Sequence, residues 1–256
     1  MFRNIQSVLG YTIKEHIRNR VYLTVFMFGF IMVAGGLVVS SLAVDERVRV
    51  LVNLGLAGIE LIALLSIVFV TVNLILEEVE SKSIYLILCH PIEKWHYVIG
   101  RYLGTLISVC SGMFMMALVH IALLKLYGWQ WHWSYAAAVA CSVGKVAIVS
   151  SLALFISLIT TSTASSMILT SFLWIMGHFS SEIKYLGEKS DNSVVKIAVA
   201  FFYHLAPDFS VFNYRDYFRS ALEVSPMFAP WLFFYTICYV SIMLYLSSWI
   251  FSNREF

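Results

Sequence analysis

Long apolar runs separated by short polar segments make up most of the chain. Six runs are long enough to cross a bilayer, since a helical span needs roughly 20 apolar residues to traverse the hydrocarbon core. They lie near 21–44, 51–76, 102–124, 134–160, 163–183 and 230–251. The pattern predicts an all-α membrane protein with six transmembrane helices, built as a single transmembrane domain over residues 1–256.

The residues before the first run follow a helical period instead. Their apolar side chains recur three or four residues apart, and the basic ones fall mostly on other faces. The apolar positions are Phe2, Ile5, Leu9, Ile13 and Ile17. This predicts an N-terminal amphipathic helix on the inner membrane surface, either as a simple anchor or as part of the surface that holds a partner subunit.

The segment 184–229, between the fifth and sixth runs, is the longest part that forms no span. Its apolar stretch 194–206 is too short to cross, because a helix of that length covers only about 20 Å. We expect short interfacial or re-entrant helices here, on the outer side. Several aromatic residues follow, and aromatic side chains favour the headgroup level. They are Phe209, Phe212, Tyr214, Tyr217 and Phe218.

Composition and charge support the membrane class and exclude others. Of the 256 residues 60% are hydrophobic and the mean hydropathy is +0.82, values too apolar for a soluble domain. The net charge of +2 gives no strongly basic face for nucleic acid. The four cysteines show no paired spacing, so we interpret them as small apolar residues rather than disulfide or metal positions. They are Cys89, Cys110, Cys141 and Cys238.

The distribution of basic residues gives an orientation. An even number of spans places both termini on one side of the membrane. Basic residues divide equally between the two sides, but four precede the first span and two follow it before the second. Because the first span often sets the orientation, we expect a multi-pass protein of the cytoplasmic (inner) membrane with both termini cytoplasmic.

The segment 77–101, between the second and third runs, gathers charge. Seven of its 25 residues are charged, against 12% in the whole chain. A connection between two spans needs only a few residues. We therefore expect this cytoplasmic segment to form a helix, a turn and a second helix that lie against another protein or the membrane surface. Its order is an acidic cluster (Glu77, Glu78, Glu80) with Lys82, an apolar run over 84–88, a turn at Pro91 and a new helix near Trp95.

This order of features resembles the first cytoplasmic loop of ABC-2-type transporter permeases. In that family the loop carries the coupling helix that docks on an ATP-binding subunit. Ser81-Lys82-Ser83 stands where the family often has a Gly-Thr pair. The stretch FFYHLAPDFSVFN at 201–213 is similar to the one before the last span in many such permeases. The loop residues that match are Glu77, Glu78, Glu80, Ile84, Leu86, Leu88, Pro91, Gly100, Arg101 and Gly104.

The resemblance implies a membrane-spanning permease subunit that forms the translocation pathway with a second copy, as a homodimer or pseudo-dimer. ATP and Mg would bind in the partner ATP-binding subunit; this chain has no GxxxxGK[ST] motif, so we expect no enzyme activity and no cofactor in it. The family usually exports, and the aromatic outer segment favours a lipid-linked or amphiphilic cargo. The implied docking residues are Glu77, Glu78, Glu80, Lys82, Ile84, Leu88, Pro91 and Trp95; the implied outer gate residues are Phe201, Phe202, His204, Pro207 and Phe212.

Two charges lie well inside the predicted spans and away from their ends, where charge is costly. Glu60 and Lys145 each come some nine to eleven residues after the outer start of their span, at a depth of about 14–17 Å. The equal depth makes them candidates for an ion pair, either as a structural brace or as part of a polar pathway.

Other chemistries remain as alternatives. A secondary transporter or channel without an ATPase partner is the main one, although the inverted repeats and broken helices typical of that class are not evident in the sequence. Glu77, Glu78 and Lys82 approach the EExxxR motif of intramembrane proteases, but no FxxxH partner accompanies them. A methionine cluster at 113–116 with His120 could pass copper, but such a run is more often packing.

The orientation can be tested by labelling. In a background without the four native cysteines, Glu223→Cys should react with a membrane-impermeant thiol reagent in intact cells. Ser252→Cys should react only after permeabilisation. The opposite pattern would contradict cytoplasmic termini.

Overall fold

The structure is a computed structural model that describes residues 2–18, 23–42, 47–81, 93–189, 206–213 and 228–253, with Lys196, Val199 and Tyr203. Within these residues all regular structure is helical. The elements are α1 (Phe2–Arg18), α2 (Leu23–Leu42), α3 (Arg47–Glu80), α5 (Lys94–Leu126), α6 (Trp133–Ile159), α7 (Thr163–His178), α8 (Ser180–Lys189), the 3-10 turn η1 (Ser210–Phe212) and α11 (Phe228–Asn253).

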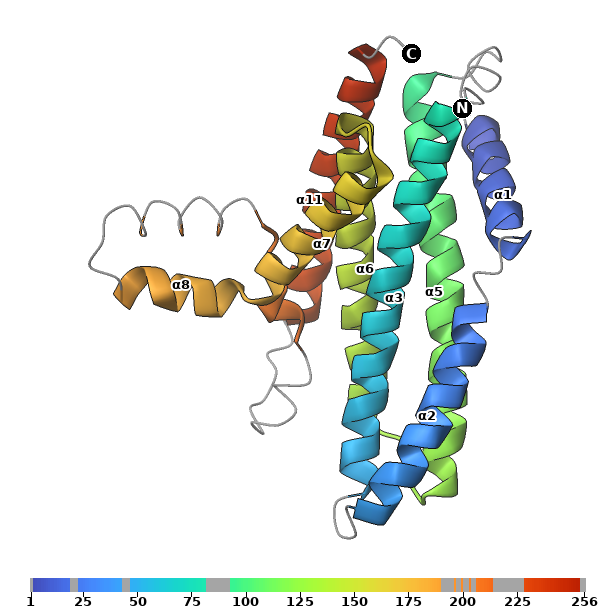
Figure 1. Ribbon diagram of the computed structural model, residues 1–256, viewed down its shortest axis with the longest axis vertical. Coiled ribbons are helices and arrows are strands. Elements are labelled where there is room, and N and C mark those ends of the chain that lie inside the picture. The colour runs from blue at the N-terminus through green and yellow to red at the C-terminus, as the bar shows by residue number, and fades with distance from the viewer. Residues whose placement is uncertain are drawn as a thin grey trace.

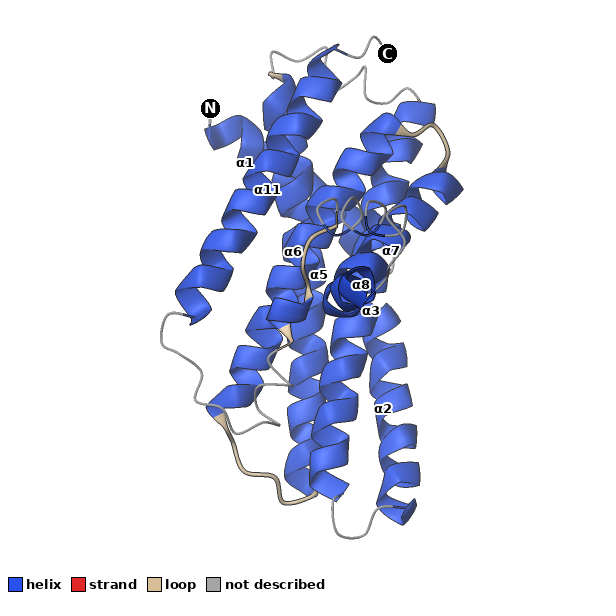
Figure 2. Ribbon diagram, turned by 90° about the vertical axis from the view of Figure 1, so that its left-hand side faces the viewer, coloured by secondary structure: helices blue, strands red, loops and turns tan. Residues whose placement is uncertain are grey.

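Most of the helices run along the long axis of an antiparallel bundle (Figure 1). α6 is its centre and packs against α3, α5, α7 and α11, while α2 covers α3 and α5. α1 lies beside α5 at the end where α3 stops and α5 starts, which we call the loop end (Figures 1 and 2). α11 also finishes at the loop end (Figure 1).

Among the described residues, four helices are long and apolar enough to cross a membrane: α3, α5, α6 and the Ala229–Asn253 part of α11. They confirm four of the six predicted spans. α2 contributes a shorter apolar stretch, Met27–Gly36. The 16 residues of α7 cover about 24 Å, against a hydrocarbon core of about 30 Å. The prediction of six spans is therefore not confirmed for α2 and α7.

The predicted fifth span, 163–183, was wrong as a single helix. α7 ends at His178, and α8 begins at Ser180 and projects sideways from the bundle (Figure 1). The cause is a competing hydrogen bond: the amide of Phe209 donates to the carbonyl oxygen of Gly177 at 2.9 Å. In a continuing helix that carbonyl would accept from residue 181. The chain therefore turns where segment 206–213 meets α7.

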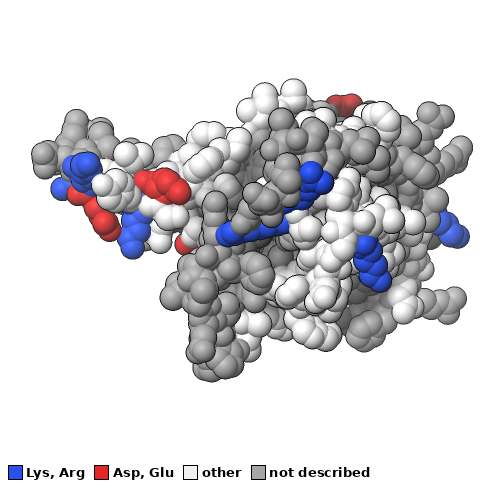
Figure 3. Space-filling view, turned by 90° about the horizontal axis from the view of Figure 1, so that it is seen from below, with Lys and Arg blue, Asp and Glu red and all other residues white. Residues whose placement is uncertain are grey.

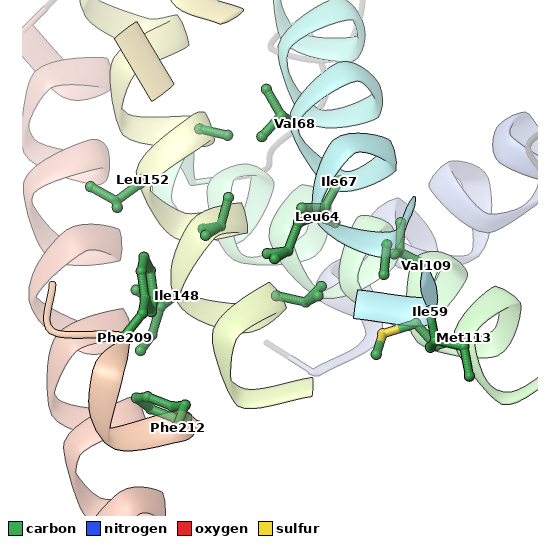
Figure 4. Packing of buried hydrophobic residues seen from close by; sticks show 14 of the residues in the cluster. Ile59, Leu64, Ile67, Val68, Val109, Met113, Ile148, Leu152, Phe209 and Phe212 are labelled. Carbon is green, nitrogen blue, oxygen red and sulfur yellow. The ribbon is translucent and has the colours of Figure 1, made fainter. Parts of the chain in front are cut away.

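Segment 206–213 lies inside the bundle and not at an outer interface. Phe209 and Phe212 are almost fully buried and lie beside α6 and α11, near Ile148 (Figure 4). An added Cβ on Gly144 of α6 would stand 2.7 Å from the ring of Phe212, so the glycine admits the ring. The expectation that these two aromatics sit at headgroup level was wrong, because protein contacts inside the bundle are available to them.

The packing around this segment predicts an asymmetric effect of two glycine substitutions. Gly177→Ala should destabilise the protein by roughly 1–3 kcal/mol, because the new Cβ would overlap the carbonyl oxygen of Pro207, which belongs to the backbone. The matched control is Gly10→Ala in α1, where no atom lies within 4 Å of the added Cβ. The control should be neutral or slightly stabilising. Melting temperatures in detergent measure both, and equal effects would contradict the inserted position of segment 206–213.

Candidate functional site

A buried arginine organises the loop end of the bundle. Arg101 of α5 has no exposed surface, and its guanidinium forms an ion pair with Glu78 in the last turns of α3. The hydroxyl of Tyr97 donates to the same carboxylate. The guanidinium also lies over the rings of Tyr97 and Tyr11, at 5.7 Å and 5.1 Å from their centroids. A buried charge needs such partners, so this contact fixes α3 against α5.

The same arginine holds the N-terminal helix. Its Nη1 donates to Thr12 Oγ1 at 3.0 Å, and the threonine hydroxyl in turn donates to the carbonyl oxygen of Val8 at 2.9 Å. An added Cβ on Gly104 would lie 2.6 Å from Thr12 Cβ, so the glycine permits α1 to approach α5 closely. Arg101 therefore joins α1, α3 and α5. We call Tyr11, Thr12, Glu78, Tyr97 and Arg101 the arginine joint.

The predicted docking residues divide around this joint. Glu77 and Glu80 are exposed on the last turn of α3, whereas Glu78 is buried and engaged with Arg101. Glu78 therefore cannot serve as a docking residue, because its carboxylate is used inside the protein. Trp95 is half-buried, and its Nε1 donates to Glu93. The other predicted docking residues lie outside the described residues: Lys82, Ile84, Leu88 and Pro91.

The end of α11 joins the same region. Lys94 Nζ donates to the carbonyl oxygen of Ser252 at 2.9 Å. The rings of Tyr97 and Phe251 stack with centroids 5.2 Å apart. The start of α5 thus contacts α1, α3 and α11, and residues 77–101 are anchored in the bundle at both described ends.

A second buried charge cluster lies deep in the bundle. Lys145 Nζ of α6 is 2.6 Å from Glu60 Oε1 of α3; the lysine has no exposed surface and the glutamate is 6% exposed. The sequence had made Glu60 and Lys145 candidates for an ion pair because of their equal depth, and the structure brings them together. The hydroxyl of Ser142, one turn before the lysine, lies 3.3 Å from Glu60 Oε2. The cluster joins α3 to α6.

The ion pair also holds the inserted segment. Lys145 Nζ donates to Asn213 Oδ1 at 2.7 Å, directly after η1. Sequence reasoning included Asn213 only as the last residue of the stretch that resembles the family and gave it no role, because a residue in a non-helical segment has no periodicity that would place it. Ser142 could have been found, since it lies three residues before Lys145 on the same face of α6. We call Glu60, Ser142, Lys145 and Asn213 the lysine cluster.

Segment 206–213 is held further by Asp208. Its carboxylate accepts from the Ser210 amide at 3.0 Å and from the Ser180 hydroxyl at 2.5 Å. Its amide lies 3.1 Å from the hydroxyl of Tyr235 on α11 and donates to it. Non-helical backbone survives at membrane depth only when protein groups satisfy it in this way.

Two of the five predicted outer gate residues lie in the described part of the chain. Pro207 and Phe212 are buried in the inserted segment, beside α7 and α6. Phe201, Phe202 and His204 lie outside the described residues. The two described members therefore belong to the interior of the bundle.

His120 braces the other end of the bundle. Its Nε2 lies 3.2 Å from the carbonyl oxygen of Leu51, and its Nδ1 lies 2.9 Å from the hydroxyl of Tyr135. A carbonyl can only accept, so Nε2 carries the proton and Nδ1 accepts from the tyrosine. Both ring nitrogens are thus used to join α3, α5 and α6. Met113 and Met116 pack in the apolar core.

A family model for ABC-2 family transporter proteins matches residues 58–255. The chain belongs to the ABC-2 transporter family. No curated protein matches the chain significantly. The match starts within α3 and covers every member of the lysine cluster, together with Glu78, Tyr97 and Arg101 of the arginine joint. This ABC-2 protein is therefore a multi-pass membrane protein of a transporter family whose membrane subunits associate with ATP-binding subunits.

The lysine cluster predicts non-additive mutational effects. Glu60→Gln or Lys145→Met alone leaves one charge buried without its counter-ion, which should cost about 3–5 kcal/mol of stability. The double variant should lose less than the sum of the two single losses. Melting temperatures in detergent test this, with the exposed Glu77→Gln as the control for the same chemical change. Strictly additive losses would show that the two side chains do not pair.

Proposed function

We propose that this ABC-2 protein is the permease subunit of an ABC transporter in the cytoplasmic membrane, with both termini cytoplasmic. With a second copy it forms the translocation pathway, and it docks a separate ATP-binding subunit at its loop end through residues 77–101. The chain itself binds no ATP; ATP and Mg belong to the partner. The observation that carries the proposal is the arginine joint, which makes the region flanking residues 82–92 a firm attachment.

A partner that moves against the loop end can shift the spans only if the push reaches them without being lost in a loose connection. Arg101 ties the start of α5 to the end of α3 and to α1, so these helices would move together. Exposed Glu77 and Glu80 lie beside this joint, where charges steer a partner and set its register more than they supply affinity.

The cargo we propose is lipid-linked or amphiphilic, moving outward. Its support is the neighbourhood of the inserted segment, where Phe209 and Phe212 lie next to the lysine cluster. Apolar rings and a charged pair so close together offer both kinds of surface to a cargo, if the bundle opens there.

A secondary transporter remains the second candidate, and one observation favours it. The helix break at Phe179 and the buried Glu60–Lys145 pair lie at middle depth, as substrate and ion sites do in that class. The two candidates differ in their dependence on a partner. Transport that continues without any ATP-binding subunit would favour the second.

The docking proposal is tested by charge reversal. Glu77→Lys with Glu80→Lys should weaken association with the ATP-binding subunit by roughly tenfold, since two repulsive contacts would replace two favourable ones. Membrane insertion and thermal stability should hold, because both side chains are exposed. Co-purification and stimulated ATP hydrolysis in proteoliposomes measure the effect.

Two control variants separate docking from folding. Glu188→Lys, an exposed acidic residue on α8, should leave association unchanged. Glu78→Gln should instead lower the melting temperature, because Arg101 would lose its counter-ion. Unchanged association and unchanged ATP hydrolysis in the Glu77 and Glu80 double variant would contradict the proposed docking site.

A further inference from the structure

α8 projects sideways from the bundle, at about the middle of the bundle's long axis (Figures 1 and 2). α7 starts at the loop end and has 16 residues, so α8 begins about 24 Å from that end. A hydrogen bond fixes this point, since the hydroxyl of Ser180 donates to the carboxylate of Asp208 in the inserted segment. The position of α8 in the bundle is therefore a consequence of the same contacts that hold segment 206–213.

The helix has one covered face and one open face. On the covered face an added Cβ at Gly187 would stand 2.6 Å from Val199 Cγ1. Every residue of α8 except Ser180, Ile183 and Gly187 is exposed, and the side turned away from Gly187, which we call the open face, carries Glu182, Tyr185, Leu186 and Lys189 at helical spacing. Tyr185 is 60% exposed and Leu186 is 61% exposed. Acidic and basic side chains lie close together on the projecting part at the left of Figure 3.

In the membrane placement of the proposed function, α8 lies at middle depth, where charged side chains cannot face lipid without a large cost. Lys189 lies over the ring of Tyr185 at 5.8 Å, and Lys184 lies over the ring of Tyr203 at 6.0 Å. These cation–π contacts provide partners for Lys184 and Lys189 but none for the acidic side chains of α8. In the described part of the chain no ion pair involves Glu182, the acidic residue of the open face. The open face of α8 therefore needs a covering surface that carries basic groups of its own.

We propose that the open face of α8 packs against the same face of α8 in a second copy, antiparallel across a twofold axis. The inference rests on the membrane placement and pairing in the proposed function, and it names the contact. With the axis between Tyr185 and Leu186, Glu182 of each copy meets Lys189 of the other. The acidic first turn and basic last turn make the helix self-complementary, as an isologous contact requires.

The surface next to α8 can extend this contact. A stable interface needs roughly 800 Å² from each partner, more than a ten-residue helix supplies. α7 and the residue directly after it carry an apolar stripe that leads to the start of α8 and is 44–70% exposed. Its members recur at helical spacing and are Ile168, Phe172, Ile175 and Phe179. Between copies, this stripe would add apolar area beside the charged pairs.

Cysteine cross-linking in native membranes tests the contact on the full-length chain. The four native cysteines are replaced, and single Tyr185→Cys or Leu186→Cys variants are oxidised. Because both positions flank the axis, their Cα atoms should come close enough to their counterparts for a disulfide, and a covalent dimer should form. Lys184→Cys, on a different face of the same helix, is the matched control and should stay monomeric.

Charge reversal tests the ionic part. Glu182→Lys should reduce the Leu186→Cys dimer severalfold, and adding Lys189→Glu should restore it, because opposite charges then face each other again across the axis. A helix that merely needed its own charges for folding would gain nothing from the second change.

The outcomes are decisive in both directions. Absence of a Tyr185→Cys or Leu186→Cys dimer would overturn the proposal, whether these cysteines react with an impermeant maleimide in intact cells, as a water-facing helix would, or do not react, as a lipid-facing one would. Co-purification of the ATP-binding subunit is scored in the same samples. A dimer without that subunit would remove the proposed docking and leave the α8 contact; the subunit without a dimer would remove only the α8 contact.

Discussion

A charged or unpaired polar group buried inside a helix bundle must find its partner within the protein, because neither lipid nor packed apolar side chains offer one. Each unusual feature of this chain follows from that constraint. Arg101 takes Glu78 and Thr12, Lys145 takes Glu60 and Asn213, and the non-helical backbone near Asp208 takes side-chain and carbonyl partners. Apolar packing alone would permit many arrangements of helices, whereas these contacts select one.

α3 connects the two charge clusters. Glu60 and Glu78 are 18 residues apart, which is about five turns, so both carboxylates project from the same side of one helix about 27 Å apart. Glu60 is paired with Lys145 of α6, and Glu78 is paired with Arg101 of α5. In the proposed function, a displacement of the loop end would therefore reach the lysine cluster through a single rigid helix. Two ion pairs on one helix give such coupling a physical route.

The sequence predicted these features unequally. Apolar run length predicted α3, α5, α6 and α11 well, and equal depth predicted that Glu60 and Lys145 meet. Glu78 was assigned to a docking surface because it belongs to the acidic cluster that resembles the coupling loop of the family. Helical spacing contained the correction, since Glu78 lies three and four residues after the buried Ile75 and Leu74. The break after α7 depends on a hydrogen bond from Phe209, some thirty residues away, which the local sequence does not reveal.

The inserted segment connects the interior of one copy to its surroundings. Asn213 attaches it to the lysine cluster, and Asp208 attaches it to Ser180 at the start of α8. If α8 is the contact between copies, segment 206–213 is acted on from two sides. A shift of α3 at the loop end would reach it through the lysine cluster, and a shift of the second copy would reach it through α8. The segment's hydrogen bonds cannot be exchanged for water in a membrane, so this stretch should move as a unit with α6 or with α8, and the proposed pathway would open where these two part.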